Sequence, residues 1–193
     1  MVRRKKYNTY RGTVGKVAPN ILERDFSTTA LNQKWVTDVS EFSLFGSKRY
    51  LSTIMDLYNR EIISFTITES PNLSMVTDML EKAFTILPDG TNLIIHSDQG
   101  WHYQHSAYQQ MLRKRGVVQS MSRKGNCLDN AIIENFFGLL KSELLYLREF
   151  ENMEHFIQEL NEYIYYYNNY RIKTGLGGLS PIQFRNQLIN PIY

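Results

Sequence analysis

The sequence predicts an α/β domain in which one five-stranded mixed sheet is flanked by helices. Two observations support this prediction: strand-like segments come first along the chain, and helical and strand-like segments alternate after them. Hairpins that lead into alternating strands and helices are typical of a mixed sheet with helices packed on its faces. At 193 residues the chain is long enough for one substantial core, and we find no internal repeat that would point to another architecture.

The first three strands are expected between residues 34 and 68. This stretch reads KWVTDVSEF, RYLSTIMDLYN and EIISFTIT, and it is rich in β-branched and aromatic residues. The turn sequences Phe45-Gly46-Ser47 and Asn59-Arg60 separate the three segments. Three antiparallel strands are the simplest interpretation of this pattern.

Helices and two further strands alternate over the next part of the chain. Residues 73–87 carry apolar side chains at helical spacing, and Pro88-Asp89-Gly90 ends this helix. The short apolar segment 92–97 fits a buried strand that emerges into Asp98-Gln99-Gly100. A helix over about 104–115, a strand over 117–122 and a loop over 123–126 are expected to follow.

The last third of the chain is predicted to be helical. One helix opens at residues 128–130, with Asp129 or Asn130 as its cap. Its core stripe is expected to run through Ile133, Phe136 or Phe137, Leu140 and Leu144. A long helix over about 152–170 follows, and Ser180-Pro181 begins a short last one.

Charge is unevenly distributed along the chain. The 22 basic and 19 acidic residues give a net charge of only +3. Residues 1–20, however, contain six basic residues and no acid: Arg3, Arg4, Lys5, Lys6, Arg11 and Lys16. Such a segment suits a polyanion, although a solvated and poorly ordered start explains it equally well. We expect a basic N-terminal extension or linker over 1–30, a core domain over 31–188 and a tail over 189–193.

Cysteine content and hydropathy bear on the compartment. Cys127 is the single cysteine, so the chain cannot form an internal disulfide. The basic start leads into polar residues, which is unlike a signal peptide, and no apolar run approaches the length needed to span a bilayer. We therefore expect a cytoplasmic protein with no membrane partner.

Three acids lie at positions that suit a catalytic site. Asp38 lies within the first strand, Asp98 directly follows the buried strand, and Glu134 lies one turn into a helix, beside its core stripe. The carboxyl ends of strands in open α/β sheets are where ligands bind. Each acid also has an ordinary interpretation: Asp38 as a surface strand residue, Asp98 as a turn residue and Glu134 as a helix N-terminal acid.

Spacing alone cannot decide between these interpretations, because 19 acids in 193 residues produce a pair at any chosen separation roughly once or twice by chance. The surrounding motifs are more specific. WVTDVSEF, IIHSDQG and DNAIIENFFGLLKSEL, with 59 and 35 residues between the three acids, resemble the DDE transposases of the retroviral-integrase superfamily. The likeness is strongest to the second-reading-frame transposases of bacterial insertion sequences, and YIYYYNNYRIKTGLGGLSPIQF extends it to nearly the whole chain.

The resemblance implies an RNase H-like fold and a metal-dependent enzyme that cleaves DNA at element ends and transfers the freed 3′ hydroxyl into another strand. Asp38, Asp98 and Glu134 would hold Mg²⁺ or Mn²⁺, as two ions, because hard cations prefer carboxylate oxygens. His96 and His102 lie near Asp98, but no metal-binding spacing surrounds them, and we expect His96 to hydrogen-bond locally. DNA and further copies of the chain are the implied partners, together with a first-frame helix-turn-helix protein or a fused recognition domain.

Several groups near the site are candidates for DNA binding. Lys141 lies two helical turns after Glu134, so it could reach a phosphate, although an ordinary exposed lysine is the alternative. The other candidates come from the loop before this helix, from its first turn and from the C-terminal motif: Arg123, Lys124, Asn130, Arg171 and Lys173. The tyrosines at 163, 166, 167 and 170 suggest a stacking platform for bases, but we expect them to pack in the core.

Two other functions remain open. The chain begins near the linker of the proteins that it resembles, so it could be a truncated, non-catalytic DNA-binding remnant that interferes with intact transposase. An RNase H-like nuclease acting on RNA–DNA hybrids fits the fold but not the C-terminal motif. Metal-dependent cleavage that requires the three acids distinguishes the transposase from the remnant, and a comparison of duplex with hybrid substrate tests the nuclease.

Overall fold

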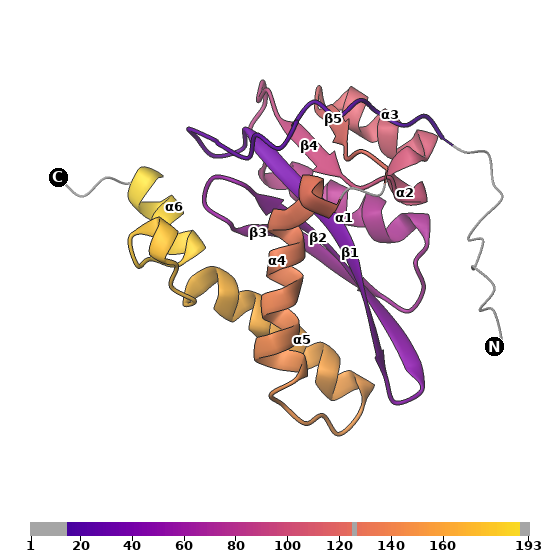
Figure 1. Ribbon diagram of the computed structural model, residues 1–193, viewed down its shortest axis with the longest axis vertical. Helices are drawn as coiled ribbons and strands as arrows, with labels where there is room; N and C mark the ends of the chain where they lie inside the picture. The colour runs from indigo at the N-terminus through magenta and orange to yellow at the C-terminus, as the bar shows by residue number, and fades with distance from the viewer. Residues whose placement is uncertain (1–14, 125–126, 190–193) are drawn as a thin grey trace.

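A five-stranded mixed sheet forms the centre of the protein, as the computed structural model shows for residues 15–124 and 127–189, the part of the chain that it describes (Figure 1). The order across the sheet is β3-β2-β1-β4-β5. The strands are β1 (Lys34–Leu44), β2 (Ser47–Asp56), β3 (Ile62–Thr68), β4 (Ile94–Ser97) and β5 (Val118–Met121). The predicted α/β class and the mixed, five-stranded sheet are confirmed.

The antiparallel half of the sheet consists of β1, β2 and β3. Phe45 and Gly46 both have positive φ angles, 52° and 69°, in the turn between β1 and β2. Two left-handed residues in succession give a tight hairpin whose twist matches that of its strands. In Figure 1 this hairpin extends beyond the rest of the sheet. Arg60, in the turn between β2 and β3, also has a positive φ of 62°.

The parallel half of the sheet joins β1 to β4 and β4 to β5. Val36 of β1 lies opposite His96 of β4. Ile95 and His96 point to opposite faces and are 1% and 0% exposed, so β4 is a central strand covered on both faces. The residues that follow His96 therefore emerge beside the middle of β1.

One face of the sheet is covered by α1 (Leu73–Ile86) and α3 (Ser106–Lys114), which the short α2 (Trp101–Gln104) precedes. Asn72 caps α1, because its Oδ1 accepts a hydrogen bond from the Met75 backbone N–H at 3.0 Å. The predicted apolar side of α1 packs against Trp35 and Ile54 of the sheet. The sheet, α1 and α3 thus enclose a core of buried side chains on this face.

The other face is covered by α4 (Ala131–Leu140), by the π-helical turn Lys141–Leu145 and by α5 (Met153–Asn169). Figure 1 shows α4 crossing this face of the sheet. The predicted core stripe of α4 is confirmed, since each of its members is at most 6% exposed: Ile133, Phe136, Phe137, Leu140 and Leu144. They pack with Val36 and Phe42, which lie on the same face of β1 as Asp38.

The segments at the two ends of the described chain pack onto this body. Ile21 donates its backbone N–H to Ser120 Oγ of β5 at 2.9 Å, and Leu22 is 2% exposed. Residues near 20, within the expected N-terminal extension, therefore lie along the edge strand. At the other end, the 3₁₀ turn Thr174–Leu176 and α6 (Pro181–Ile189) follow α5.

Three local predictions need correction. The helix expected over 104–115 is divided at His105, whose ψ of 138° ends α2 and whose Nδ1 caps α3 by accepting from Ala107 N–H. Asn130 occupies the N-cap position of α4, as expected, but its side chain makes no capping hydrogen bond, and the segment Cys127–Asn130, where the helix is expected to open, forms a 3₁₀ turn. Asp129 instead binds arginine side chains.

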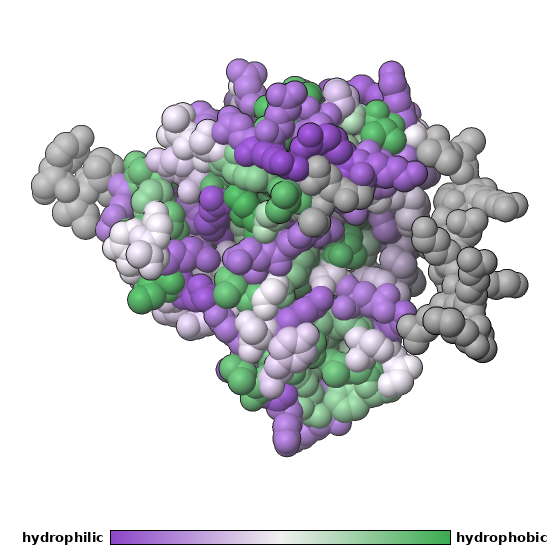
Figure 2. All heavy atoms as spheres, in the orientation of Figure 1, coloured by the Kyte–Doolittle hydropathy of each residue, from purple (hydrophilic) through white to green (hydrophobic). Residues whose placement is uncertain are grey.

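The tyrosine-rich part of α5 is only half buried, which is the third correction. Tyr163 and Tyr167 are 7% and 2% exposed, as expected of core residues, whereas Tyr166 and Tyr170 are 47% and 60% exposed. The buried stripe of α5 passes through Leu160, Tyr163, Ile164 and Tyr167, so it rotates past the other two tyrosines. On the face drawn in Figure 2, hydrophobic residues are interspersed with hydrophilic ones. None of the described helices has both the length and the apolar character needed to cross a membrane.

Candidate active site

The parallel pairing of β1 and β4 places Asp38 and Asp98 side by side. Val36 and His96 are partners in this ladder, and the two aspartates stand two residues further along their chains. Residues two apart in a strand point to the same face. Asp38 and Asp98 therefore approach each other on the face that α4 crosses.

Helix α4 brings the third acid to this place. The packing of Ile133 and Phe136 against the sheet fixes the rotation of the helix. Glu134, in the first turn of α4, is exposed beside that buried stripe. Both Asp98 and Glu134 act electrostatically on Asp38, so the structure brings the three predicted acids together beside the middle of β1, where β4 ends.

The electrostatics of Asp38 depart strongly from those of an ordinary aspartate. Burial is the largest cause that raises its pKa to about 7, followed by the charge of Asp98 and, more weakly, that of Glu134. A hydrogen bond from the Val39 backbone N–H, at 2.8 Å from Oδ1, acts in the opposite direction. A carboxylate with its charge in this position is favoured only when a cation compensates it.

The backbone after β4 holds Asp98 in a tight turn. Oδ1 of Asp98 accepts a hydrogen bond from the Gly100 N–H at 2.8 Å. A Cβ atom at Gly100 would lie 2.9 Å from that same oxygen and 3.3 Å from Cδ2 of Tyr103. Residue 100 must therefore be glycine for the carboxylate to keep this position.

Tyr103 is a residue of the site that sequence reasoning missed. It is 1% exposed, and its hydroxyl lies 3.4 Å from Thr37 Oγ1. Burial, together with the charges of Asp38 and Asp98, raises its pKa well above the ordinary value. The neutral tyrosine ring is thus buried beside the two aspartates. The only sequence signal was its position three residues after Gly100.

The donor set fits a hard divalent cation. Carboxylate oxygens are the ligands that Mg²⁺ prefers, and burial together with the neighbouring acids raises the pKa of Asp38, an effect that a bound cation would oppose. Within residues 15–124 and 127–189, no three acid, histidine or cysteine side chains are arranged closely enough to enclose a metal ion. The three acids are thus coupled through space without forming a closed set of ligands.

The nearby histidines have other partners, as expected for His96. Its Nδ1 lies 2.8 Å from Ser120 Oγ, which joins β4 to β5. Nε2 of His102 lies 3.0 Å from the carbonyl oxygen of Pro71, ahead of α1. Burial lowers the pKa of both imidazoles, which favours their neutral forms.

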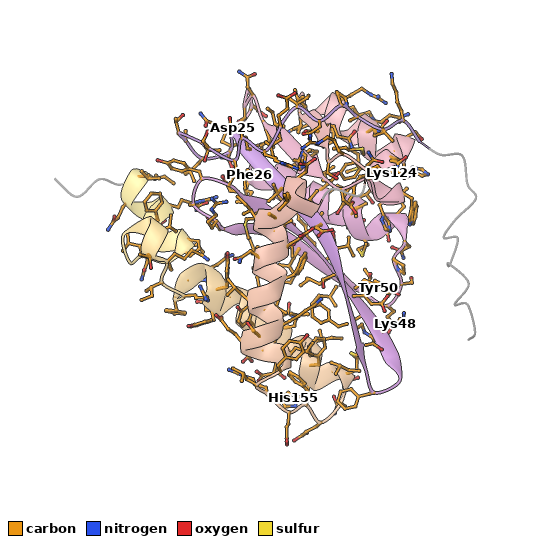
Figure 3. All side chains as sticks on the ribbon, viewed as in Figure 1. Asp25, Phe26, Lys48, Tyr50, Lys124 and His155 are labelled. Atoms are coloured by element: carbon orange, nitrogen blue, oxygen red, sulfur yellow. The ribbon has the colours of Figure 1, made fainter. Side chains whose placement is uncertain are left out.

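Lys141 is the predicted DNA contact that acts electrostatically on the acid site. Lys141 acts on Asp38 and lowers its pKa, and its Nζ lies 5.7 Å from the centre of the Phe42 ring. Its position is therefore compatible with a phosphate at the acid site. Lys124 is exposed on the loop after β5 and is labelled in Figure 3.

The other four predicted DNA contacts are less accessible or already paired. Arg123 and Arg171 bind Asp129 and Glu143 at 2.9 Å. Asn130 is 3% exposed, so it is not a surface group in this structure. Nζ of Lys173 lies 4.1 Å from the centre of the Tyr167 ring. DNA binding by each of these residues stays a prediction.

The sequence matches the integrase core domain family in two segments, residues 28–127 and 134–189. It is 52% identical to the putative transposase InsK of insertion sequence element IS150 from Escherichia coli K12, over 97% of this chain and 66% of that protein. It is 49% identical to a transposase-like protein of Haemophilus influenzae, over 96% and 85%. Transposase InsF of IS3A from Escherichia coli K12 is 34% identical, over 93% and 62%.

Solved integrase structures share the fold. The catalytic core domain of HTLV-2 integrase, determined with magnesium in a trimeric form, superposes with a TM-score of 0.61 at 17% identity, over 79% of this chain and 95% of that one. A chain of the simian T-cell lymphotropic virus intasome gives a TM-score of 0.65 at 17% identity, over 98% of this chain and 64% of that one. The predicted RNase H-like fold is confirmed.

The fold is thus that of integrase catalytic cores. The chain belongs to the integrase core domain family and, within it, to the transposases of bacterial insertion sequences. It spans 66% of the length of InsK and 62% of that of InsF.

Proposed function

We propose that this chain is the catalytic core of a transposase that cleaves DNA strands at element ends and joins the freed 3′ hydroxyl to a target strand, using divalent metal ions. The observation that carries the proposal is the coupling of Asp38, Asp98 and Glu134, which come from two neighbouring strands and the helix above them. The family membership supports it, because the relatives named above are transposases.

The acids provide the chemistry that phosphodiester cleavage needs. Bound Mg²⁺ or Mn²⁺, most effectively as two ions, supplies activation of the attacking oxygen and stabilisation of the leaving one. Asp38 and Asp98 would hold both ions, since they stand side by side, and Glu134 would complete the ligand set of one. Lys141 would bind a phosphate beside them, and the buried Tyr103 would exclude water from one side of the site.

We further propose that the active form is an oligomer assembled on DNA. Support comes from the structural relatives, since the HTLV-2 integrase core was determined in trimeric and dimeric forms and the simian virus protein as an intasome. The recognition of element ends by a first-frame helix-turn-helix protein, or by a domain joined to this one, belongs to the same proposal.

The direct test is strand cleavage by the purified chain. Labelled duplex DNA and supercoiled plasmid are incubated with Mg²⁺, Mn²⁺ or EDTA, using wild type, Glu134→Gln and Glu154→Gln. Glu154 is a matched control, because it is also an exposed acid in the first turn of a helix, at the start of α5. We expect metal-dependent nicking or joining that falls at least about a thousandfold in Glu134→Gln and is unchanged in Glu154→Gln.

The other outcomes contradict the proposal in different ways. DNA binding without cleavage in any metal would favour a non-catalytic, interfering remnant. Equal cleavage by Glu134→Gln would remove Glu134 from the site. Faster cleavage of an RNA–DNA hybrid than of duplex DNA would point to an RNase H-like nuclease.

A further inference from the structure

A cavity of 320 Å³ lies on the other flank of α4, among the N-terminal part of this helix, the β2–β3 turn and the segment after α5. Ile132 and Asn135 line it from α4, and Tyr167 lines it from α5. Its size is at the lower end of the range for ligand sites. Its two charged lining residues are both cations, Arg60 and Lys173.

Arg60 has no acidic partner in the described part of the chain. Its φ of 62° lies in the left-handed region, where a residue with a side chain is held at a cost of about 1 kcal/mol. Nη1 is buried and has no hydrogen-bond partner among residues 15–124 and 127–189. A buried guanidinium nitrogen without an acceptor is costly, so Arg60 is not explained by the stability of the free protein.

Lys173 contacts an aromatic ring and not an acid. Its Nζ lies 4.1 Å from the centre of the Tyr167 ring, and no ion pair joins it to an acid within the described ranges. Burial, followed by the nearby charges of Arg171 and Arg60, lowers its pKa to about 8, and the charge of Glu143 opposes this shift only in part. Two cations thus share one cavity and repel each other.

The acids around this cavity are already engaged. Glu143 binds Arg171 and accepts a hydrogen bond from the Tyr163 hydroxyl at 2.8 Å. Asp56, which acts electrostatically on Arg60, accepts hydrogen bonds from the backbone N–H groups of Asn32 and Tyr58. Among the described residues, the two cavity cations therefore lack an unengaged acid that would balance them, and an external anion could take this place.

The position of the cavity indicates which anion this is. Asn135, which lines it, is the next residue after Glu134 on α4. The same two turns of helix thus contribute to the acid site on one flank and to the cavity on the other. A DNA strand that placed a phosphodiester at the acids would pass along this helix.

We propose that the cavity of Arg60 and Lys173 binds a backbone phosphate of DNA close to the phosphodiester at the acid site. This inference rests on the proposed function, because the ligand is taken to be the DNA that the acid site would cleave. Arginine and lysine around a phosphate oxygen form charge-assisted hydrogen bonds, and the apolar lining of Ile132 and Tyr167 keeps them poorly solvated, which strengthens the contact.

Binding of labelled duplex DNA in EDTA tests this site without any metal or cleavage. Fluorescence anisotropy is measured over a series of KCl concentrations for wild type, Arg60→Gly and Lys173→Met. Glycine suits the positive φ at residue 60, and methionine keeps an unbranched chain over Tyr167, so both variants should fold. Lys114→Met removes an exposed lysine of α3 as a control, and Arg60→Lys keeps the charge.

We expect binding about tenfold weaker in Arg60→Gly and in Lys173→Met, with the salt slope reduced by roughly one in each. Lys114→Met should match wild type, and Arg60→Lys should recover most of the affinity. Wild-type affinity and slope in both cavity variants, with unchanged unfolding temperatures, would overturn the proposal. Wild type that does not bind duplex DNA would overturn it as well.

The same variants distinguish DNA from a free anion. If inorganic phosphate raises the unfolding temperature of wild type but not of Arg60→Gly, while DNA binding is equal in both, the cavity serves a free anion and the DNA assignment is wrong. Because these measurements are made in EDTA, their failure is separate from failure of the cleavage assay with Glu134→Gln.

Discussion

Asp38 and Asp129 are two aspartates with little exposure and opposite surroundings. Asp129, 1% exposed at the foot of α4, accepts hydrogen bonds from Arg24, Arg123 and Asn20, and these contacts hold its pKa well below the usual range. Asp38 faces two further acids, and its pKa is raised to about 7. The first carboxylate is neutralised by arginines of the chain, whereas burial and two neighbouring acids disfavour the charge of the second.

The charge of Asp129 stabilises the fold, and the charge of Asp38 does not. Asp129 ties the segment near Asn20 to the loop before α4, so its charge stabilises the folded protein as it stands. Asp38 opposes folding while it is ionised, because burial and its neighbours disfavour the charge. The cavity of Arg60 and Lys173 resembles the surroundings of Asp38 in that like charges lie close together, but there the charges are positive.

The largest effect on stability is expected at Asp38. Because its folded pKa lies above the unfolded value of 3.8, the folded state binds more protons, so in EDTA the free energy of unfolding falls as pH rises from about 4 to 7. The full effect is on the order of 4 kcal/mol. Asp38→Asn should remove this slope and raise stability at pH 8, as chemical denaturation measures. An unchanged slope in Asp38→Asn would refute this origin.

The opposite sign is expected at Asp129. Asp129→Asn removes the charge that Arg24 and Arg123 share, so the unfolding temperature at pH 7 should fall by roughly 4 °C. Asp78→Asn, at an exposed site of α1, should have no effect. If Asp129→Asn is as stable as wild type, the contrast between the two aspartates fails.

Gly100 connects the fold to the acid site. In Gly100→Ala the new Cβ would stand 2.9 Å from Asp98 Oδ1, so the carboxylate must move. We expect Mn²⁺ affinity and metal-dependent cleavage to fall about tenfold, with the protein still folded. The matched control is Gly138→Ala on α4, where a Cβ meets nothing within 4 Å. Equal metal binding by both variants would show that Asp98 needs no fixed position.

The smallest expected effect is the pH dependence of DNA binding in EDTA. Lys173 has a pKa of about 8, so it loses its charge between pH 7 and 9 and its phosphate contact weakens. Wild-type affinity should therefore fall a few-fold more over this range than that of Lys173→Met. Parallel pH profiles would mean that Lys173 carries no DNA contact.

The sheet and the three acids could be predicted because they rest on local signals. The strands alternate or run apolar, α4 shows its stripe, and the motifs around Asp38, Asp98 and Glu134 are specific in type and spacing. The structure then brings the acids together through the pairing of Val36 with His96.

The remaining features depend on contacts between distant parts of the chain. Asp129 has the sequence signature of a helix cap, but Arg24, far away in sequence, competes for its carboxylate. Arg60 reads only as a turn residue until the segment after α5 brings Lys173 beside it. Tyr103 is an unremarkable aromatic residue until the fold buries it beside the aspartates.

The most direct test of the central claim is a calorimetric titration of Mn²⁺ into the metal-free chain near pH 6, in two buffers of different ionisation enthalpy. The three acids should bind the ion and release about one proton, because Asp38 is largely protonated beforehand. Glu154→Gln should behave as wild type, and Glu134→Gln should bind more weakly. Equal binding by wild type, Asp38→Asn and Glu134→Gln, with no proton released, would contradict the claim that these acids form the metal site.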